Sequence, residues 1–559
     1  MKEDILFRKA KPIADPTTRY PGFNPSATIL AKGTVVTPGT LPLPCDILFE
    51  RDVAVPLRDG AIIYTDIFRP VNATALPAIV AWSPYGKEGG ESLLDDVPER
   101  YGVPKHASSG LEKWEGPDPA YWCAYGYAII NPDARGAYMS QGDIYFWGAQ
   151  EGQDGYDLIE WVAARAWSNG KVGMSGNSWL AIAQWFIAAE QPPHLTAFAP
   201  WEGFTDFYHD ASFRGGMPDF AFLEKSVAAK SGNGRVEDVP AMGQKYPLMN
   251  AYWEDKAAKL DQITIPAYVV ASWTNGLHTP GTFVGYQRIA SPDKWLRVHN
   301  THEWPDYYDS HYQNDLRRFF DHYLRGVNNG WEDTPRVRIS LLNAEDDQDV
   351  DRPEGQFPLA QTAYTPLYLD ARAGQLALAP TDEAASARYA AESHGSAVFQ
   401  LRFERDTALI GFLKLRLWVE AQGADDMDLF VLIQQLDEQG NVVVPKTWEP
   451  NWTGPHGRLR VSHRQLDPAR STPPQPYHTH TEEQRLTPGQ IVAVEIGLTP
   501  IGLRWHAGQL LRLTIAGYNP AQLGFDWAIP LNTRNQGEHV IHTGGQYDSH
   551  LLIPIIPPA

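Results

Sequence analysis

A serine on a sharp turn is the residue of this 559-residue chain with the clearest chemical potential. The stretch from Lys171 to Glu190 reads KVGMSGNSWLAIAQWFIAAE, which predicts a short strand, a turn at Ser178 and an apolar helix. Such a turn pushes the hydroxyl away from the backbone, while the first N–H groups of the helix point toward whatever bonds to that oxygen. The arrangement suits a nucleophile whose reaction intermediate carries an oxyanion.

The same turn has a simpler interpretation. Serine is a common N-capping residue, so Ser178 could merely begin a buried helix. The turn also departs from the strict G-x-S-x-G pattern, because Leu180 stands where the second glycine belongs. The nearby Ser175 belongs to the strand by its pattern. Ser178 is therefore the favoured nucleophile.

A serine nucleophile needs a base, and the base needs an orienting partner. In the α/β-hydrolase order the histidine follows both the nucleophile and the acid, which directs attention to His278, His299 and His302 near predicted strand ends. His299 still lies on its strand pattern. His302 lies in the following loop, where side chains reach the edge of the sheet, and we favour it as the base. A surface or hydrogen-bonded core histidine is the alternative.

The elements that would position these residues alternate between strands and helices. Apolar runs at 78–82 and 127–131 predict buried parallel strands, and 154–167 predicts an amphipathic helix with Asp154 as its N-cap. Strand patterns return at 266–273 and 294–299, before a helix over 310–324 that Gly326 ends. The alternation predicts a doubly wound sheet.

The chain divides into segments of different character. We expect an extension over residues 1–50, an α/β core in two parts, a helical insertion without strands between these parts, and an all-β sandwich or jelly roll at the end. The two core parts are expected at 51–202 and 263–334. The insertion lies between them at 203–262, and the sandwich follows at 335–559.

Composition limits the partners. The net charge of −20 argues against nucleic acid and against an anionic membrane. The two cysteines form no disulfide framework, and no apolar run resembles a leader or a membrane span, so we expect a cytoplasmic protein. His478 and His480 have no further ligand at metal-binding spacing, which predicts a solvated loop. We expect neither a metal nor a cofactor.

Several further segments give the chain a resemblance to the CocE/NonD hydrolases, the group of bacterial cocaine esterase, α-amino-acid ester hydrolases and X-Pro dipeptidyl-peptidases. The resemblance covers about residues 50–559 and implies an α/β-hydrolase domain with an inserted helical cap, followed by a C-terminal jelly roll. It rests on the segments VPLRDG (55–60), DIFRP (66–70), SPYGK (83–87), GYA (126–128), DARG (133–136) with Ser140 and Gly142, WSNGKVGM (167–174), PG (488–489) and AGQLLRL (507–513).

The resemblance also implies roles for single residues. Ser178 matches the nucleophile, and His302 matches the base. The backbone N–H of Trp179, where the family usually has tyrosine, and the hydroxyl of Tyr85 match the two donors of the oxyanion hole.

One position departs from the family pattern. The catalytic aspartate of the family stands in a W-x-D motif, and here Trp273 is followed by Thr274 and Asn275. An amide cannot stabilise an imidazolium as a carboxylate does. Asn275 could orient His302 by a hydrogen bond, which we prefer, or the enzyme could be slow or suited to an activated substrate. A carboxylate could also come from elsewhere in the chain, the nearest being Glu303, Asp306 and Asp309.

The sequence thus predicts a serine hydrolase that cleaves a small-molecule ester or amide through an acyl-enzyme. An X-Pro dipeptidyl aminopeptidase or an acylase is the alternative, and either would need pocket carboxylates for a substrate ammonium, with Glu202, Asp206 and Asp210 as candidates. Acyl transfer is a further alternative. Because the aspartate is missing, a binding module on a degenerate hydrolase scaffold also has to be considered. Assembly into a homo-oligomer is left open.

Overall fold

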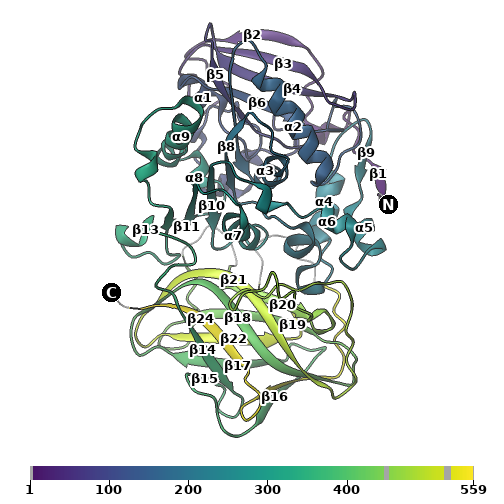
Figure 1. Ribbon diagram of the computed structural model, residues 1–559, viewed down its shortest axis with the longest axis vertical. Coiled ribbons are helices and arrows are strands. Elements are labelled where there is room, and N and C mark those ends of the chain that lie inside the picture. The colour runs from purple at the N-terminus through teal and green to yellow at the C-terminus, as the bar shows by residue number, and fades with distance from the viewer. Residues whose placement is uncertain (1–3, 446–451, 522–530, 558–559) are drawn as a thin grey trace.

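The structure is a computed structural model that describes residues 4–445, 452–521 and 531–557. An α/β part forms the upper half of the molecule in Figure 1, and a part built almost wholly of strands lies below it. None of the helices in these residues is long and apolar enough to cross a membrane.

The α/β part is built around an eleven-stranded mixed sheet. Neighbouring strands from β6 to β12 are parallel, whereas the strands at both edges are antiparallel. The order across the sheet is β13 (Arg352–Glu354), β12 (Val337–Ile339), β11 (Lys294–His299), β10 (Ala267–Ser272), β8 (Leu195–Trp201), β7 (Ser168–Asn177), β5 (Leu76–Val80), β6 (Ala128–Asp133), β4 (Ile62–Pro70), β3 (Ile47–Pro56) and β2 (Ser26–Leu30).

Helices cover both faces of this sheet, as parallel strands require. Apolar residues of α2, α3 and α7 pack into one hydrophobic cluster with the sheet, and those of α1, α8 and α9 pack into another. The helices are α1 (Pro119–Ala124), α2 (Ala149–Ala163), α3 (Trp179–Ala189), α4 (Ala221–Ala229), α5 (Val239–Lys245), α6 (Ala251–Asp255), α7 (Thr279–Arg288), α8 (Pro305–Tyr308) and α9 (Ser310–Arg325).

Several local predictions can be compared with these bounds. The strand at 294–299 is confirmed, and Gly326 ends α9 in a left-handed conformation with φ 69°. The prediction that Asp154 caps a helix is wrong, because α2 begins at Ala149 and the Asp154 carboxylate pairs with Arg135 (2.6 Å). The insertion after β8 also holds a short strand, β9 (Arg235–Glu237), which pairs with β1 (Phe7–Lys9) of the N-terminal extension.

The all-β part contains a second large sheet, in which each pair of neighbours is antiparallel except β15 with β17. Its order is β16 (Ala385–Ala390), β23 (Glu538–Thr543), β18 (Thr407–Gln422), β24 (His550–Ile556), β14 (Ala363–Asp370), β15 (Gln375–Ala377), β17 (Ser396–Arg402), β22 (Leu510–Ala516), β19 (Asp428–Leu436) and β20 (His456–Arg460), with β21 (Ile491–Trp505) paired to β18.

The two parts are in close contact. Trp273, just after β10, donates its indole N–H to the carbonyl oxygen of Ser340 (2.7 Å), the residue after β12 of the same α/β part. The same indole lies so near Gly502 of β21 that a Cβ there would be 2.5 Å from the ring. Only glycine therefore allows this approach between the end of a core strand and the all-β part.

The loop that carries His478 and His480 belongs to the same interface. Both histidines are buried, so the prediction of a solvated loop is wrong. His209, from the insertion after β8, donates a ring N–H to the carbonyl oxygen of His478 (2.9 Å). The insertion and the all-β part therefore bury this loop between them.

Candidate active site

Ser178 lies between β7 and α3 with φ 53° and ψ −119°, a conformation that is strained for a residue with a side chain. All residues of α3 are described, and the Ser178 hydroxyl makes no capping hydrogen bond to this helix. The interpretation of Ser178 as a mere N-cap is therefore wrong. A Cβ at Gly176 would come within 2.6 Å of the Leu180 side chain, which explains why glycine precedes the turn.

Two other residues around this turn share its backbone strain. Glu202, directly after β8, has φ 53°, and its carbonyl oxygen accepts the Ser178 N–H (3.1 Å). Glu115 has φ 64°, and its carbonyl oxygen accepts the N–H of Asn177 (3.1 Å). Strained residues that meet at one point are typical of a functional site, because the surrounding fold must hold each of them in place.

A histidine lies against the Ser178 hydroxyl. His278 Nε2 is 3.1 Å from Ser178 Oγ, and the His278 ring packs on the ring of Phe204 at a centroid distance of 5.8 Å. His278 stands immediately before α7, in the loop that follows β10. Burial lowers the pKa of His278 to about 4, although the charge of Glu202 opposes this shift. The imidazole is therefore neutral at physiological pH and can accept a proton.

His302, the base that the sequence favoured, lies in the loop after β11. Its ring stacks on Tyr101 with a centroid distance of 4.5 Å and an interplanar angle of 7°, and Trp304 lies at 4.8 Å. The role of His302 stays a prediction. The sequence placed His278 among the three candidates, but the loop after β10 gave no sign of how closely it approaches Ser178.

Asn275 joins two carboxylates. Its Nδ2 donates to Glu202 Oε2 and to Glu303 Oε2, both at 3.0 Å. Its Oδ1 accepts the backbone N–H groups of Leu277 and His278, both at 3.2 Å. A carboxylate at this position could not donate to either glutamate, which gives a physical reason for asparagine here. The predicted hydrogen bond from Asn275 to His302 stays a prediction.

Glu202 has further partners besides Asn275. Its side chain is fully buried, with Oε1 2.7 Å from His299 Nε2, and the hydroxyl of Ser272 donates to Oε2 (2.9 Å). Burial alone would raise the pKa of Glu202, but its close contact with His299 and the other nearby histidines lower the pKa below its ordinary value. An ionised carboxylate thus lies close to His278 and within the same network.

The other carboxylates near His302 have partners of their own. Asp306 Oδ2 pairs with Arg297 (2.6 Å), and its Oδ1 accepts a hydrogen bond from Thr301 (2.8 Å). Asp309 caps α9 by accepting the N–H of His311 (2.8 Å). Glu303 remains as the nearest acid that joins the network, through Asn275.

The arrangement around Asn275 makes a testable prediction. Asn275→Asp would place a third carboxylate between Glu202 and Glu303, and we expect it to lower the free energy of unfolding at pH 7 by about 3 kcal/mol. Mutual repulsion raises the pKa of the cluster in the folded state, so the loss should shrink as the pH falls and a proton binds. Urea denaturation at pH 5 and pH 8 measures this.

Asn72→Asp serves as the matched control, because Asn72 lies exposed in a surface turn. It adds the same charge and should leave the free energy of unfolding within about 0.5 kcal/mol. An Asn275→Asp protein as stable as the wild type at both pH values would show that the two glutamates do not repel a third charge.

Tyr85 and Trp179 lie near the serine, and their predicted roles as oxyanion donors stay predictions. Burial raises the pKa of the Tyr85 hydroxyl well above its ordinary value, and nearby Ser178 opposes this shift. Trp179 is the first residue of α3, its indole N–H donates to Glu151 (2.9 Å), and its ring meets the Tyr85 ring edge-on at 5.9 Å. The positive end of the helix and a phenol hydroxyl thus approach the same point in space.

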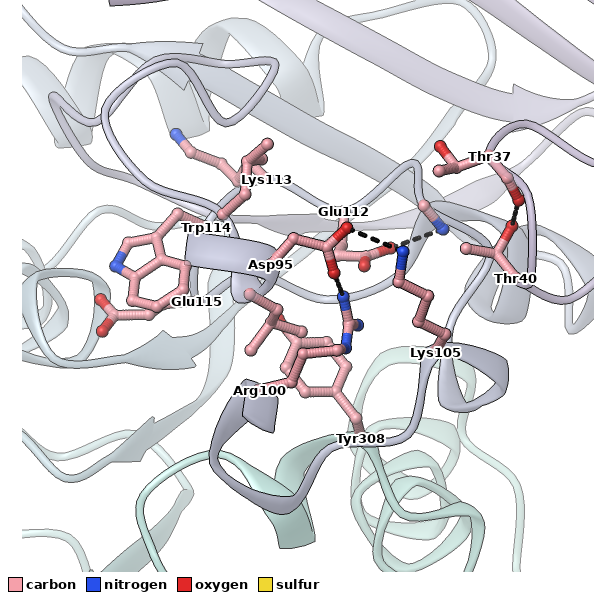
Figure 2. A pocket seen from close by; sticks show the side chains of 13 residues that line it. Thr37, Thr40, Asp95, Arg100, Lys105, Glu112, Lys113, Trp114, Glu115 and Tyr308 are labelled. Atoms are coloured by element: carbon pink, nitrogen blue, oxygen red, sulfur yellow. Dashed lines mark hydrogen bonds and ion pairs between the residues drawn. The ribbon is translucent and has the colours of Figure 1, made fainter. Parts of the chain in front are cut away.

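A cavity of about 120 Å³ lies beyond Glu115 (Figure 2). Arg100 and Lys105 approach each other across it because both pair with Asp95. The Glu115 side chain points away from these cations. The cavity is lined by Thr37, Thr40, Leu93, Leu94, Asp95, Arg100, Lys105, Gly110, Glu112, Lys113, Trp114, Glu115 and Tyr308.

Comparison with known proteins identifies the family of this chain. Residues 59–246 match the family described as X-Pro dipeptidyl-peptidase (S15 family), and residues 329–552 match the X-Pro dipeptidyl-peptidase C-terminal non-catalytic domain. The crystal structure of a CocE/NonD family hydrolase from Staphylococcus aureus is 36% identical and superposes with a TM-score of 0.84, covering 92% of this chain and 94% of that one.

Two other relatives are more distant. Cocaine esterase of Rhodococcus sp. is 23% identical over 382 residues, which span 57% of this chain and 62% of the esterase. An α-amino-acid ester hydrolase is 16% identical with a TM-score of 0.68, covering 91% of this chain and 97% of that one, and supports the fold alone. The chain belongs to the CocE/NonD hydrolase family and is a serine hydrolase of carboxylic esters or amides.

Proposed function

We propose that Ser178 attacks the substrate carbonyl while His278 takes the serine proton. The observation that carries this proposal is the 3.1 Å contact between His278 Nε2 and Ser178 Oγ on the strained turn. The N–H of Trp179 and the hydroxyl of Tyr85 stabilise the oxyanion. His278 then returns its proton to the leaving group, and water hydrolyses the acyl-enzyme by the same route in reverse.

The acid of the site is Glu202 in this proposal. Protonated His278 carries a positive charge, and the nearby ionised carboxylate of Glu202 favours that charge. Asn275 holds the loop of His278 by its two backbone contacts and connects that loop to Glu202. The Asn275 amide therefore positions His278 through the backbone. The negative charge comes from Glu202, which follows β8, the strand paired with β10.

An ester with an apolar group is the substrate class that the surroundings favour. A dipeptidyl-peptidase needs a free carboxylate for the substrate ammonium, and the three candidates are already engaged. Glu202 binds His299, Asp206 lies 2.9 Å from His209, and Asp210 accepts the N–H groups of Thr205 and Asp206.

Aromatic side chains supply the apolar surface. Phe204 packs on the base, and Trp147 lies between Phe204 (4.9 Å) and Trp179 (4.3 Å). These rings come from three separate segments that meet beside Ser178. They provide the contacts that an aromatic or aliphatic acyl or alcohol group would need.

The domain division goes with this assignment. Helices α4, α5 and α6 follow β8 before the chain returns to the sheet at β10, which supports a cap over residues 203–262. Residues 51–202 and 263–334 then belong to the α/β-hydrolase core, but β12 and β13 also pair into the core sheet, so the boundary at 335 is too early and the jelly roll begins after β13. The extension at 1–50 contributes β1, which pairs with β9 of the cap, and β2, which pairs with β3 of the core.

The experiment combines active-site labelling with a substrate comparison. A fluorophosphonate probe should label the protein, with the adduct mapped by mass spectrometry to the peptide that contains Ser178. We expect kcat/KM for p-nitrophenyl butyrate to exceed that for Gly-Pro-p-nitroanilide by about a hundredfold or more, because the three candidate carboxylates for the dipeptide ammonium are already engaged. Faster cleavage of the anilide would reverse the substrate assignment, and no labelling would favour the binding module.

A further inference from the structure

A buried lysine from the insertion after β8 lies over the aromatic rings beside the nucleophile. Lys230 directly follows α4, and its side chain is almost wholly buried. Its Nζ lies 5.1 Å from the centroid of the Tyr85 ring and 5.0 Å from that of the Trp179 ring. An ammonium at this distance is attracted by the electron-rich face of an aromatic ring. One side chain of the insertion therefore contacts both residues to which the oxyanion donors are assigned.

A carboxylate from the loop of Tyr85 fixes this ammonium. Lys230 Nζ lies 2.9 Å from both side-chain oxygens of Glu91. Glu91 is tied to Tyr85 in turn, because its backbone N–H donates to the carbonyl oxygen of Tyr85 (2.8 Å). The side chains of Lys230 and Glu91 are 1% and 15% exposed. A pair so far from water keeps its geometry, since separating the two groups would leave a buried charge without a partner.

The backbone of Lys230 is held from the opposite side. Its carbonyl oxygen accepts the N–H of Lys11 in the N-terminal extension (2.9 Å), and the carbonyl oxygen of Ser231 accepts the N–H of Tyr138 (2.8 Å). The Tyr138 hydroxyl reaches back to the carbonyl oxygen of Tyr85 (3.4 Å). The lysine therefore cannot leave the Tyr85 ring unless the insertion also moves away from the extension and from Tyr138.

Resting on the proposed function, we infer that Lys230 is a positioning residue whose ammonium, fixed by Glu91, holds the Tyr85 ring where its hydroxyl meets the oxyanion on Ser178. The Tyr85 ring meets Trp179 edge-on at 5.9 Å and has the ammonium over its ring, so its neighbours restrict both its place and its tilt. A donor that is already in place stabilises the oxyanion without reorganising as the charge develops.

The role of Lys230 is one of orientation rather than of charge. The carboxylate of Glu91 offsets the ammonium at close range, which leaves little net field at the reaction centre. The oxyanion exists only after the serine has attacked, so a misplaced Tyr85 hydroxyl costs transition-state stabilisation and not substrate binding. Loss of Lys230 should therefore appear in kcat and hardly in KM.

The test compares Lys230→Met with Lys414→Met. Methionine keeps an unbranched stem and removes the ammonium, and for Lys230→Met we expect kcat for p-nitrophenyl butyrate to fall by about tenfold or more, with KM changed by less than about threefold. Lys414, in β18 of the C-terminal sheet, is also buried and also lies 2.9 Å from a glutamate, Glu495. Lys414→Met loses a comparable ion pair far from the nucleophile and should keep kcat within about twofold.

The dependence on the tyrosine hydroxyl is tested in a Tyr85→Phe background. Phenylalanine keeps the ring beneath the ammonium and removes only the hydroxyl, which should lower kcat by about a hundredfold. Adding Lys230→Met to Tyr85→Phe should cost less than about a further twofold, because Lys230 acts through the missing hydroxyl. A lysine that served only the stability of the fold would not produce this non-additivity in kcat.

Glu91→Gln is the second variant, and it decides the matter if Lys230→Met does not fold. It removes the charge that fixes the ammonium and keeps a side chain of the same length. We expect kcat to fall by about threefold to tenfold, and by less than about twofold in the Tyr85→Phe background. Circular dichroism and the Tm show whether each variant is folded.

Three results would overturn the inference. They are a wild-type kcat in folded Lys230→Met or Glu91→Gln protein, an equal loss of kcat in Lys230→Met and Lys414→Met, and fully additive losses when Lys230→Met is combined with Tyr85→Phe. Failure of the proposed function itself looks different, because the wild type would then not be labelled at Ser178 by the fluorophosphonate probe.

Discussion

His278→Ala is expected to lower kcat by about four orders of magnitude, with a small change in KM. Without the imidazole, Ser178 has no acceptor for its proton, and the leaving group has no donor. Steady-state kinetics with p-nitrophenyl butyrate measure the loss. The His278 ring is buried against Phe204, so the Tm of the variant must be compared with that of the wild type.

His302→Ala is the matched control. The ring of His302 stacks on Tyr101 and lies near Trp304, so its removal costs packing, and we expect kcat to fall by less than about tenfold. The reverse pattern, an active His278→Ala protein and an inactive but folded His302→Ala protein, would assign the base to His302 as the sequence predicted.

The pH dependence of kcat/KM gives an independent test of whether His278 is the base. The pKa of His278 is lowered to about 4, so the ring stays neutral at all pH values above that and accepts a proton only in this neutral form. The acid limb of kcat/KM should therefore fall near pH 4, well below the value of about 6.5 expected for an exposed histidine. An acid limb near pH 6.5 would speak against His278.

Ser178→Ala is expected to lower kcat by about 10⁵-fold or more and to abolish fluorophosphonate labelling, because the acyl-enzyme forms on the serine hydroxyl. Ser178→Gly should be equally inactive but more stable. Glycine adopts φ 53° without the clash that a Cβ causes, so its free energy of unfolding should exceed that of Ser178→Ala by about 1–2 kcal/mol. Kinetics, labelling and urea denaturation of the pair check both parts.

Either half of this result can fail separately. More than about 1% residual activity in Ser178→Ala would show that another group carries the reaction. Equal stability of the two variants would show that the turn stores little strain.

Local patterns in the sequence were enough to predict the elements around Ser178, whereas its role as the nucleophile stays a prediction. The strand, the turn at Ser178 and the apolar helix are contiguous, so their periodicity reveals them, and the strand at 294–299 and the end of α9 at Gly326 are predictable for the same reason. The start of α2 was misplaced because Asp154 resembles an N-cap in sequence, whereas its carboxylate serves Arg135 from inside the helix.

The contacts around His278 and Asn275 could not be predicted from local sequence patterns. The sequence showed that an aspartate was missing at Asn275, but Glu202 stands 73 residues earlier and reaches it only because β8 and β10 pair side by side. Neither spacing nor composition reveals a contact made across a sheet. The approach of His278 to Ser178 is of the same kind, over 100 residues.

The contact between Trp273 and Gly502 has a consequence for the architecture as a whole. Trp273 stands two residues before Asn275 and five before His278, so the loop with the base starts from an indole seated on β21. Among the residues that the structure describes, the C-terminal sheet gives no side chain to the proposed reaction centre, yet its contact with Trp273 fixes the position from which that loop starts. An α/β part separated from the C-terminal sheet would therefore keep the turn of its nucleophile but lose the position of its base.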